Sequence, residues 1–229
     1  MKNVKLKICG MRHPENIQEV ASLHPDYLGF IFYEKSPRNF EGIIPKIPQS
    51  IKKVGVFVDA NIDFIKKKIN QYNLDIIQLH GDESVDYIKE LKTNCLVEHS
   101  RDLEAGFSQE LIIWKVFSIK DEFDFELLKL YDGVVDAFLF DTKGKQKGGN
   151  GYTFNWNVLK EYNSKTPIVL SGGIGLDELT ELERILKTNL PIQVIDVNSK
   201  LEESPGLKSI KKVKEFVTRI KNIEKRKEI

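Results

Sequence analysis

Cysteine is scarce in this sequence, and long apolar runs are missing. Its 229 residues include only two cysteines, Cys9 and Cys95, too few for the disulfide framework of a small secreted domain. The longest apolar runs, near residues 54–58 and 192–197, are of strand length, whereas a membrane-spanning helix needs ~18 apolar residues. The first five residues contain no apolar segment typical of a signal peptide. These absences predict a cytoplasmic protein with free thiols.

An excess of charge of either sign is also lacking. Lysine and arginine total 35 and aspartate and glutamate total 34, for a net charge of +1, so the composition predicts no nucleic-acid partner and no membrane partner. Hydrophobic residues make up 41% of the chain and aromatic residues 10%, which is enough for a sizeable core. The length fits one large domain or two small ones.

Short runs rich in β-branched residues alternate with segments of helical periodicity. We expect eight strands, over residues 4–9, 27–32, 53–58, 75–79, 111–117, 137–140, 167–170 and 192–197. Such alternation implies a parallel sheet, and eight units approach the ~250 residues usual for a (β/α)8 barrel. An open doubly wound sheet is the structural alternative. We predict an α/β fold in which residues 1–229 form a single (β/α)8 TIM barrel domain.

Two segments fit this pattern poorly, and the tail of the chain is a separate case. The stretch after the second strand contains Pro37, Pro45 and Pro48, so its helix is expected to be short or broken. Residues 93–110 form an extra segment between the fourth helix and the fifth strand. The tail, residues 221–229, is rich in lysine and glutamate and is expected to fray.

Polar residues and glycines follow nearly every predicted strand. They include Cys9-Gly10, Ser36-Pro37-Arg38, Gln78-Leu79-His80-Gly81, Asp141-Thr142, Ser171-Gly172-Gly173 and Asp196-Val197-Asn198-Ser199. In a parallel barrel the carboxyl ends of the strands build the active site. We therefore expect these residues to line one functional site.

The first predicted strand alternates between two faces. Its apolar residues are expected to face the surrounding helices, which turns Lys7 and Cys9 toward the barrel interior. A buried lysine needs a carboxylate partner, and Asp196 and Asp141 are both available. The ammonium group is also expected to lower the pKa of the Cys9 thiol.

The Gly172-Gly173 pair follows the seventh predicted strand. In this fold the loops after the seventh and eighth strands commonly bind phosphate through backbone amides, and glycine lets the backbone approach an anion closely. A tight turn without a ligand is the alternative interpretation.

Short motifs occur in a fixed order along the chain. They are Lys7–Met11, Leu28–Phe32, Ser36–Arg38, Val54–Val58, Gln78–Glu83, Asp141–Thr142, Gly148–Gly151, Thr153–Trp156, Leu170–Gly173, Asp196–Ser199 and Pro205–Gly206. Each motif alone is weak, but the ordered set is specific and covers residues 4–210. The set resembles the phosphoribosylanthranilate isomerase family of tryptophan biosynthesis.

The resemblance implies a (β/α)8 barrel that isomerises N-(5-phosphoribosyl)anthranilate to 1-(2-carboxyphenylamino)-1-deoxyribulose 5-phosphate. This Amadori rearrangement, the third step of tryptophan synthesis from chorismate, is an aldose–ketose isomerisation that uses no cofactor and no metal. The family pattern makes Cys9 the general base and Asp141 the general acid. A carboxylic acid can protonate the ribose ring oxygen, and a thiolate can remove the C2 proton of the resulting Schiff base.

The resemblance also implies how the small phosphosugar–anthranilate substrate binds. Arg38 would bind the anthranilate carboxylate, because a guanidinium offers parallel N–H groups to a planar carboxylate. Asp196 would lie near the ribose hydroxyls. The phosphate would be surrounded by Gly172, Gly173, Asn198 and Ser199, and further residues that could line the site are Lys7, Gln78, His80 and Gly149. We expect a monomer or a homodimer.

Four positions depart from the family pattern. Asn150 occupies the third place of a loop that usually reads Gly-Gly-Thr/Ser-Gly, and Lys200 stands where glycine is usual. Asn198 replaces a usual serine, and Ser209 replaces a usual aspartate. If position 200 needs a positive φ, Lys200 is strained; alternatively, its charge binds the phosphate. The four departures concern phosphate binding rather than the type of reaction.

Other interpretations compete with this one. A phosphosugar barrel similar to indole-glycerol-phosphate synthase or to an epimerase would need a catalytic Lys/Glu pair or metal-ligating histidines at the strand ends, and neither set is evident. A phosphate-binding module without catalysis would not need both Cys9 and Asp141. Without the resemblance, Cys9 would be interpreted as an inert core residue, Arg38 as a solvated loop residue and His80 as a structural histidine.

Overall fold

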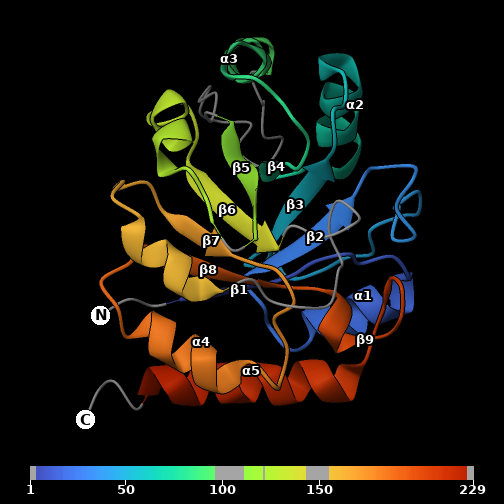
Figure 1. Cartoon of the computed structure of the whole chain (residues 1–229). Coiled ribbons are helices and arrows are strands. Elements are labelled where there is room, and N and C mark those ends of the chain that lie inside the picture. Colours follow the sequence, from blue (N-terminus) through green and yellow to red (C-terminus); the bar gives the residue numbers. More distant parts are fainter. Residues whose placement is uncertain (1–3, 96–110, 121, 143–154, 226–229) are drawn as a thin grey trace.

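The computed structural model describes residues 4–95, 111–120, 122–142 and 155–225. Its parallel strands form a closed barrel in chain order, with β8 paired to β1 (Figure 1). The strands are β1 (Lys5–Ile8), β2 (Tyr27–Ile31), β3 (Lys52–Phe57), β4 (Ile76–Leu79), β5 (Ile112–Ile119), β6 (Ala137–Thr142), β7 (Ile168–Leu170) and β8 (Ile192–Val197). The predicted barrel is confirmed, and every predicted strand overlaps an observed one.

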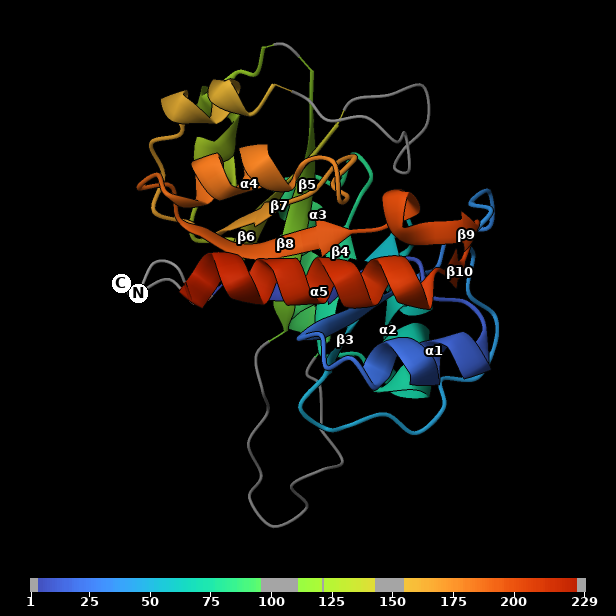
Figure 2. The ribbon, with the colours of Figure 1, turned by 90° about the horizontal axis from the view of Figure 1, so that it is seen from below.

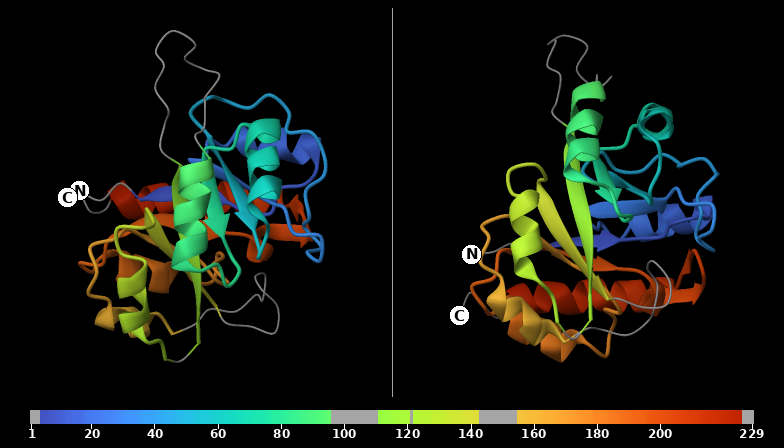
Figure 3. Two further views of the ribbon diagram at one scale, coloured as in Figure 1. Left: turned by 90° about the horizontal axis from the view of Figure 1, so that it is seen from above. Right: turned by 45° about the horizontal axis from the view of Figure 1, so that its top comes forward.

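Helices surround the barrel, as the two views of Figure 3 show. The α-helices are α1 (Pro14–Ala21), α2 (Ile62–Tyr72), α3 (Val85–Asn94), α4 (Leu179–Leu186) and α5 (Ile210–Lys225), and the connections after β5 and β6 contain the 3-10 helices η1 (Phe125–Leu130) and η2 (Trp156–Glu161). The Asn61 side chain accepts a hydrogen bond from the Phe64 N–H at 2.8 Å and so caps α2. None of the described helices is long and apolar enough to cross a membrane.

The segments that fitted the pattern poorly have distinct outcomes. The connection between β2 and β3, residues 32–51, contains no helix, in keeping with its prolines. Helix α3 continues to Asn94, and the rest of the predicted extra segment, residues 96–110, lies outside the described residues. Helix α5 continues to Lys225, so the first part of the predicted frayed tail is helical, and residues 226–229 are not described.

Two apolar clusters stabilise the fold. One lies between the strands and the helices. The other fills the barrel itself and consists of Tyr27, Val54, Ile76, Trp114, Val116, Ala137, Leu139, Val169 and Val194, with Tyr27 and Trp114 packed edge to face at 5.3 Å. This packing follows from strand periodicity, because alternate residues of each strand point inward. The barrel is therefore filled below the carboxyl ends of its strands.

A small hairpin follows β8 and lies beside α1, next to the amino end of α5 (Figure 2). It contains the 3-10 helix η3 (Ser199–Leu201), β9 (Glu202–Ser204) and β10 (Leu207–Lys208), with β9 and β10 antiparallel. The Asn16 side chain on α1 holds the hairpin by accepting from the Lys208 N–H at 2.8 Å and donating to the Lys208 carbonyl at 2.9 Å. The hairpin thereby brings Glu202 and Lys208 close to the strand ends.

Candidate functional site

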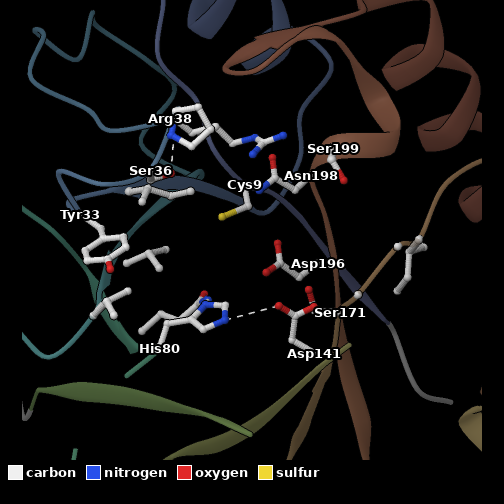
Figure 4. Close-up of a pocket in the computed structure, with 18 of the residues that line it drawn as sticks. Cys9, Tyr33, Ser36, Arg38, His80, Asp141, Ser171, Asp196, Asn198 and Ser199 are labelled. Atoms are coloured by element: carbon white, nitrogen blue, oxygen red, sulfur yellow. Dashed lines mark hydrogen bonds and ion pairs between the residues drawn. The ribbon is translucent and has the colours of Figure 1, made fainter. Parts of the chain in front are cut away.

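A cavity of about 610 Å³ lies at the carboxyl ends of the strands, a volume typical of small-molecule sites. Most of the predicted site residues line it (Figure 4): Cys9, Arg38, Gln78, His80, Asp141, Gly172, Gly173, Asp196, Asn198 and Ser199. The structure thus brings residues from β4, β6 and β8, and from the segments that follow several of the strands, to one place. Lys7 lies one inward position below Cys9 and is fully buried, and Gly149 lies outside the described residues.

Lys7 is paired with Asp196 at the base of this cavity. The register of β1 against β8 places the two residues opposite each other, and the Lys7 Nζ lies 2.7 Å from Oδ2 of Asp196. It also donates to Oε1 of Gln78 at 2.8 Å. Burial, the largest single influence, would lower the pKa of Lys7, but the charges of Asp196 and Cys9 and the hydrogen bonds to them together raise it. Of the two carboxylates that the sequence left open, Asp196 is therefore the partner.

Two opposing influences act on the Cys9 thiol. Burial raises its pKa above the ordinary value, and the Lys7 ammonium lowers it only in part. The predicted effect of the ammonium is therefore confirmed in sign, but burial outweighs it. A thiolate at this depth loses its hydration, which the sequence pattern does not indicate.

Gly29 on β2 makes room for these two side chains. A Cβ at this position would lie 2.8 Å from Sγ of Cys9 and 3.0 Å from Cε of Lys7, distances shorter than van der Waals contact. Glycine inside a strand often marks a close approach of this kind. Gly29 was therefore a sequence signal that the Cys9 side chain lies close to β2, which strand periodicity alone does not indicate.

A nitrogen lies close to each carboxylate oxygen of Asp141. Its Oδ1 accepts a hydrogen bond from the Thr142 N–H at 2.8 Å, and its Oδ2 lies 3.4 Å from Nε2 of His80 (Figure 4). Gly172, at φ +89°, packs against this group, because a Cβ there would collide with Thr142 and lie 3.0 Å from Oδ1 of Asp141. The positive φ and the close approach both require glycine at position 172.

Glu202, which the sequence analysis did not identify, organises the opposite rim. It accepts hydrogen bonds from Nε of Arg38 at 3.0 and 3.1 Å and from Nη2 at 2.7 Å. The fully buried Lys208 donates to Oε1 of Glu202 at 2.6 Å and to Oδ1 of Asn198 at 2.7 Å. The only available signal was the Pro205-Gly206 turn, which lies between Glu202 and Lys208 and brings them together.

Burial and charge act differently on the two members of this pair. Burial would raise the pKa of Glu202, but hydrogen bonds and charge from Arg38 and Lys208 lower it. Burial lowers the pKa of Lys208 to about 8, although Glu202 opposes the change. Glu202 is therefore ionised near neutral pH and holds both cations.

Lys200 does not have the backbone strain that its replacement of glycine suggested. Among the described residues other than glycine, positive φ occurs only at His24, Asp59 and Asn73. Nζ of Lys200 lies 3.3 Å from Oε1 of Glu178. Of the two alternatives for position 200, strain therefore does not apply, because Lys200 is not among the residues with positive φ. Asn150 lies outside the described residues.

Part of the cavity wall was also missed. Tyr33 and Lys35 come from the loop after β2, and an apolar wall is formed by Ile31, Val56, Val58 and Ile174. Inward alternation along the second and third predicted strands could have identified Ile31, Val56 and Val58, whereas Ile174 and the loop residues carry no periodic signal. In the described residues, no group of three or more His, Cys, Asp or Glu side chains is placed to hold a metal ion.

Comparison with known proteins gives the same family along nearly the whole chain. The model of the N-(5'phosphoribosyl)anthranilate isomerase family matches residues 6–219. The chain is 40% identical over 222 residues to an N-(5'-phosphoribosyl)anthranilate isomerase of Parabacteroides distasonis, and the match covers 94% of this chain and 92% of that protein.

Solved structures with lower identity show the same fold. A phosphoribosyl anthranilate isomerase from Thermus thermophilus has a TM-score of 0.77 at 21% identity, with 96% of this chain and all of that chain covered. Another, crystallised with reduced 1-(o-carboxyphenylamino)-1-deoxyribulose 5-phosphate, has a TM-score of 0.72 at 22% identity, over 96% and 99% of the chains. A third structure, described as monomers generated from the dimeric phosphoribosylanthranilate isomerase of Thermotoga maritima, has the same TM-score at 24% identity, over the same shares.

Proposed function

The chain belongs to the N-(5'-phosphoribosyl)anthranilate isomerase family, and from this premise we propose how its cavity carries out the isomerisation. The reaction belongs to tryptophan biosynthesis and converts an aldose derivative into a ketose derivative. It requires an acid at the ribose ring oxygen and a base at C2. The observation that carries the assignment of these roles is that Cys9 and Asp141 line the same cavity.

Asp141 is the general acid. It closes an apolar strand, is 7% exposed, and faces the cavity (Figure 4). Transfer of its proton to the ribose ring oxygen accompanies cleavage of the bond between that oxygen and C1. The products of this step are the Schiff base of the open sugar and the Asp141 carboxylate.

Cys9 is the general base. Its sulfur points into the cavity, which Asp196 also lines (Figure 4). The Schiff base acidifies the C2 proton, which the thiolate removes, and the resulting enolamine tautomerises to the ketone. Because burial favours the neutral thiol, the Lys7 ammonium is needed to stabilise the thiolate. Each proton transfer of this kind contributes ~10²–10⁴-fold to the rate.

Substrate binding uses the remaining groups around the cavity. Glu202 occupies Nε and Nη2 of Arg38, which holds the guanidinium so that its other N–H groups can bind the anthranilate carboxylate. The apolar wall with Ile31 and Val56 suits the aromatic ring of the substrate.

The sugar phosphate is proposed to lie on the opposite side. Oδ1 of Asp196 is buried and has no hydrogen-bond partner among the described residues, so a ribose hydroxyl can donate to it. The phosphate site consists of Gly172, Gly173, Asn198 and Ser199, where the glycines at φ +89° and +65° let backbone amides approach an anion. Lys200 adds no unpaired charge, because it is paired with Glu178.

Two substitutions test the catalytic roles. Cys9→Ala and Asp141→Asn are each expected to lose most of kcat, measured by the fluorescence decay of phosphoribosylanthranilate made in situ. Both variants should still bind a reduced product analogue, because neither side chain forms the carboxylate or phosphate site. Cys95→Ala is the matched control, since Cys95 caps α3 through its backbone N–H, which donates to the Leu91 carbonyl, and it does not line the cavity. Near-wild-type turnover of Cys9→Ala would refute the mechanism.

Two further expectations concern the whole protein. We propose that it is cytoplasmic, and that it is a monomer or a homodimer. Sedimentation of the purified chain at several concentrations distinguishes the two oligomeric states. Neither state affects the proposed chemistry, because one chain supplies every residue assigned to it.

A further inference from the structure

A chain of polar contacts runs along the cavity floor from Lys7 to Asp141. The Lys7 Nζ lies 2.8 Å from Oε1 of Gln78, and Nε2 of Gln78 lies 3.4 Å from Nδ1 of His80. Nε2 of His80 in turn lies 3.4 Å from Oδ2 of Asp141. Lys7 is fully buried and Gln78 is 2% exposed, so water does not compete for the first link. The contacts therefore connect the residue beneath the base with the acid.

The Lys7 ammonium determines which groups donate and which accept along this row of polar contacts. An ammonium group has hydrogen-bond donors only, so Gln78 must present its carbonyl oxygen to Lys7 and its NH2 group to His80. The reverse orientation of the amide would set two donors against each other. Asp196 holds the Lys7 Nζ in place from another side, at 2.7 Å, so the ammonium cannot turn away from Gln78 without leaving its carboxylate.

These donor and acceptor roles select the tautomer of His80. An amide NH2 group only donates, so Nδ1 of His80 accepts and carries no proton. In the neutral imidazole the proton is then on Nε2, the nitrogen that faces Asp141 (Figure 4). This Nε2 is buried and has no hydrogen-bond partner among the described residues. Its N–H is thus held near Asp141 without being bonded to it.

We propose that Gln78 is a positioning residue for the isomerisation, because it fixes His80 as the Nε2–H tautomer and so keeps a donor 3.4 Å from Oδ2 of Asp141. The inference rests on the proposed role of Asp141 as general acid. When Asp141 gives its proton to the ribose ring oxygen, it becomes a carboxylate. Its Oδ1 already accepts the Thr142 N–H, and the His80 N–H supplies a donor for Oδ2. The negative charge that forms during proton transfer therefore meets a donor that is already in place.

Nitrogen-15 NMR of the histidine rings tests the tautomer without reference to activity. The chain has four histidines, and comparison with His80→Asn assigns the His80 signals. The wild-type protein is expected to show a protonated Nε2 and a bare Nδ1. In Gln78→Glu, one carboxylate oxygen accepts from Lys7 and the other accepts from His80, so the proton is expected on Nδ1. A wild-type His80 protonated on Nδ1 would overturn the proposal.

Steady-state kinetics tests the consequence for catalysis. Gln78→Glu is expected to reduce kcat ~10²-fold, the effect of losing one donor to a developing charge, while KM changes little. Gln78→Met has a similar size and breaks the chain without reversing it, so its loss of kcat should be smaller. Wild-type kcat in Gln78→Glu, together with a proton on Nδ1, would contradict the proposed role.

The outcome remains decisive if Gln78→Glu does not fold. Gln78→Met is then expected to give a mixture of His80 tautomers and a reduced kcat, and an unchanged tautomer would refute the role of Gln78. The two proposals also fail separately. If Asp141→Asn kept turnover, the acid would be misassigned whatever the tautomer. If Asp141→Asn lost turnover while wild-type His80 was protonated on Nδ1, only the role of Gln78 would fall.

Discussion

Replacing Lys7 by methionine changes the ionisation of Cys9 in a direction that the structure determines. Burial raises the pKa of the Cys9 thiol, and the Lys7 ammonium is the largest influence that lowers it. Lys7→Met removes this influence and is expected to raise the pKa of Cys9 further. Methionine keeps most of the volume of the side chain, so the apolar packing around β1 is retained.

The magnitude follows from the charges on either side of the thiol. An adjacent opposite charge typically shifts a pKa by ~1–3 units, but Asp196 opposes the Lys7 effect on Cys9. Asp196 without its cation is expected to take up a proton, so its own influence on Cys9 also disappears. The net rise is then ~1 unit, and the thiolate population at neutral pH falls ~10-fold.

The assay is the rate of alkylation as a function of pH. Both proteins carry Cys95→Ala, so that Cys9 is the only remaining thiol. Asp196→Asn is the opposing control, because removal of the carboxylate is expected to lower the pKa of Cys9. If the pKa of Cys9 were unchanged or lower in Lys7→Met, the assignment of Lys7 as the residue that stabilises the thiolate would be refuted.

Two further predictions concern the stability of the rim. Glu202→Gln leaves Arg38 and the fully buried Lys208 without their carboxylate. This change is expected to lower the free energy of unfolding by ~3–5 kcal/mol and the Tm in calorimetry by ~6–20 °C. An unchanged Tm would show that the cations find other partners. The second is a pH effect. The pKa of Lys208 is lowered to about 8 from an ordinary value of 10.5, so between these two pH values the unfolded chain binds more protons than the folded one. The free energy of unfolding, compared with that of Lys208→Met, should therefore rise with pH in this range, with a slope of up to ~1.4 kcal/mol per pH unit. The free energy of unfolding is measured by denaturant titration of the two proteins from pH 8 to 10. The same pH dependence in both would contradict the burial of a charged Lys208.

Much of the site could be predicted from local sequence. The alternation of strands and helices implies a parallel barrel, and in such a barrel the residue that follows each strand lies at one rim. Cys9, Asp141 and Asp196 were therefore assigned to a common site without coordinates, and the same two-residue period placed Lys7 inside the barrel.

The tertiary structure decided what depends on contacts between distant parts of the chain. Asp196 rather than Asp141 pairs with Lys7 because the register of β1 against β8 sets them opposite each other, and closure of the barrel fixes that register. Glu202 joins the site only because the hairpin folds back on Arg38. The net pKa of Cys9 depends on how deeply the thiol is buried. Strand periodicity determines which way a side chain points, but its partners and its hydration depend on the assembled barrel.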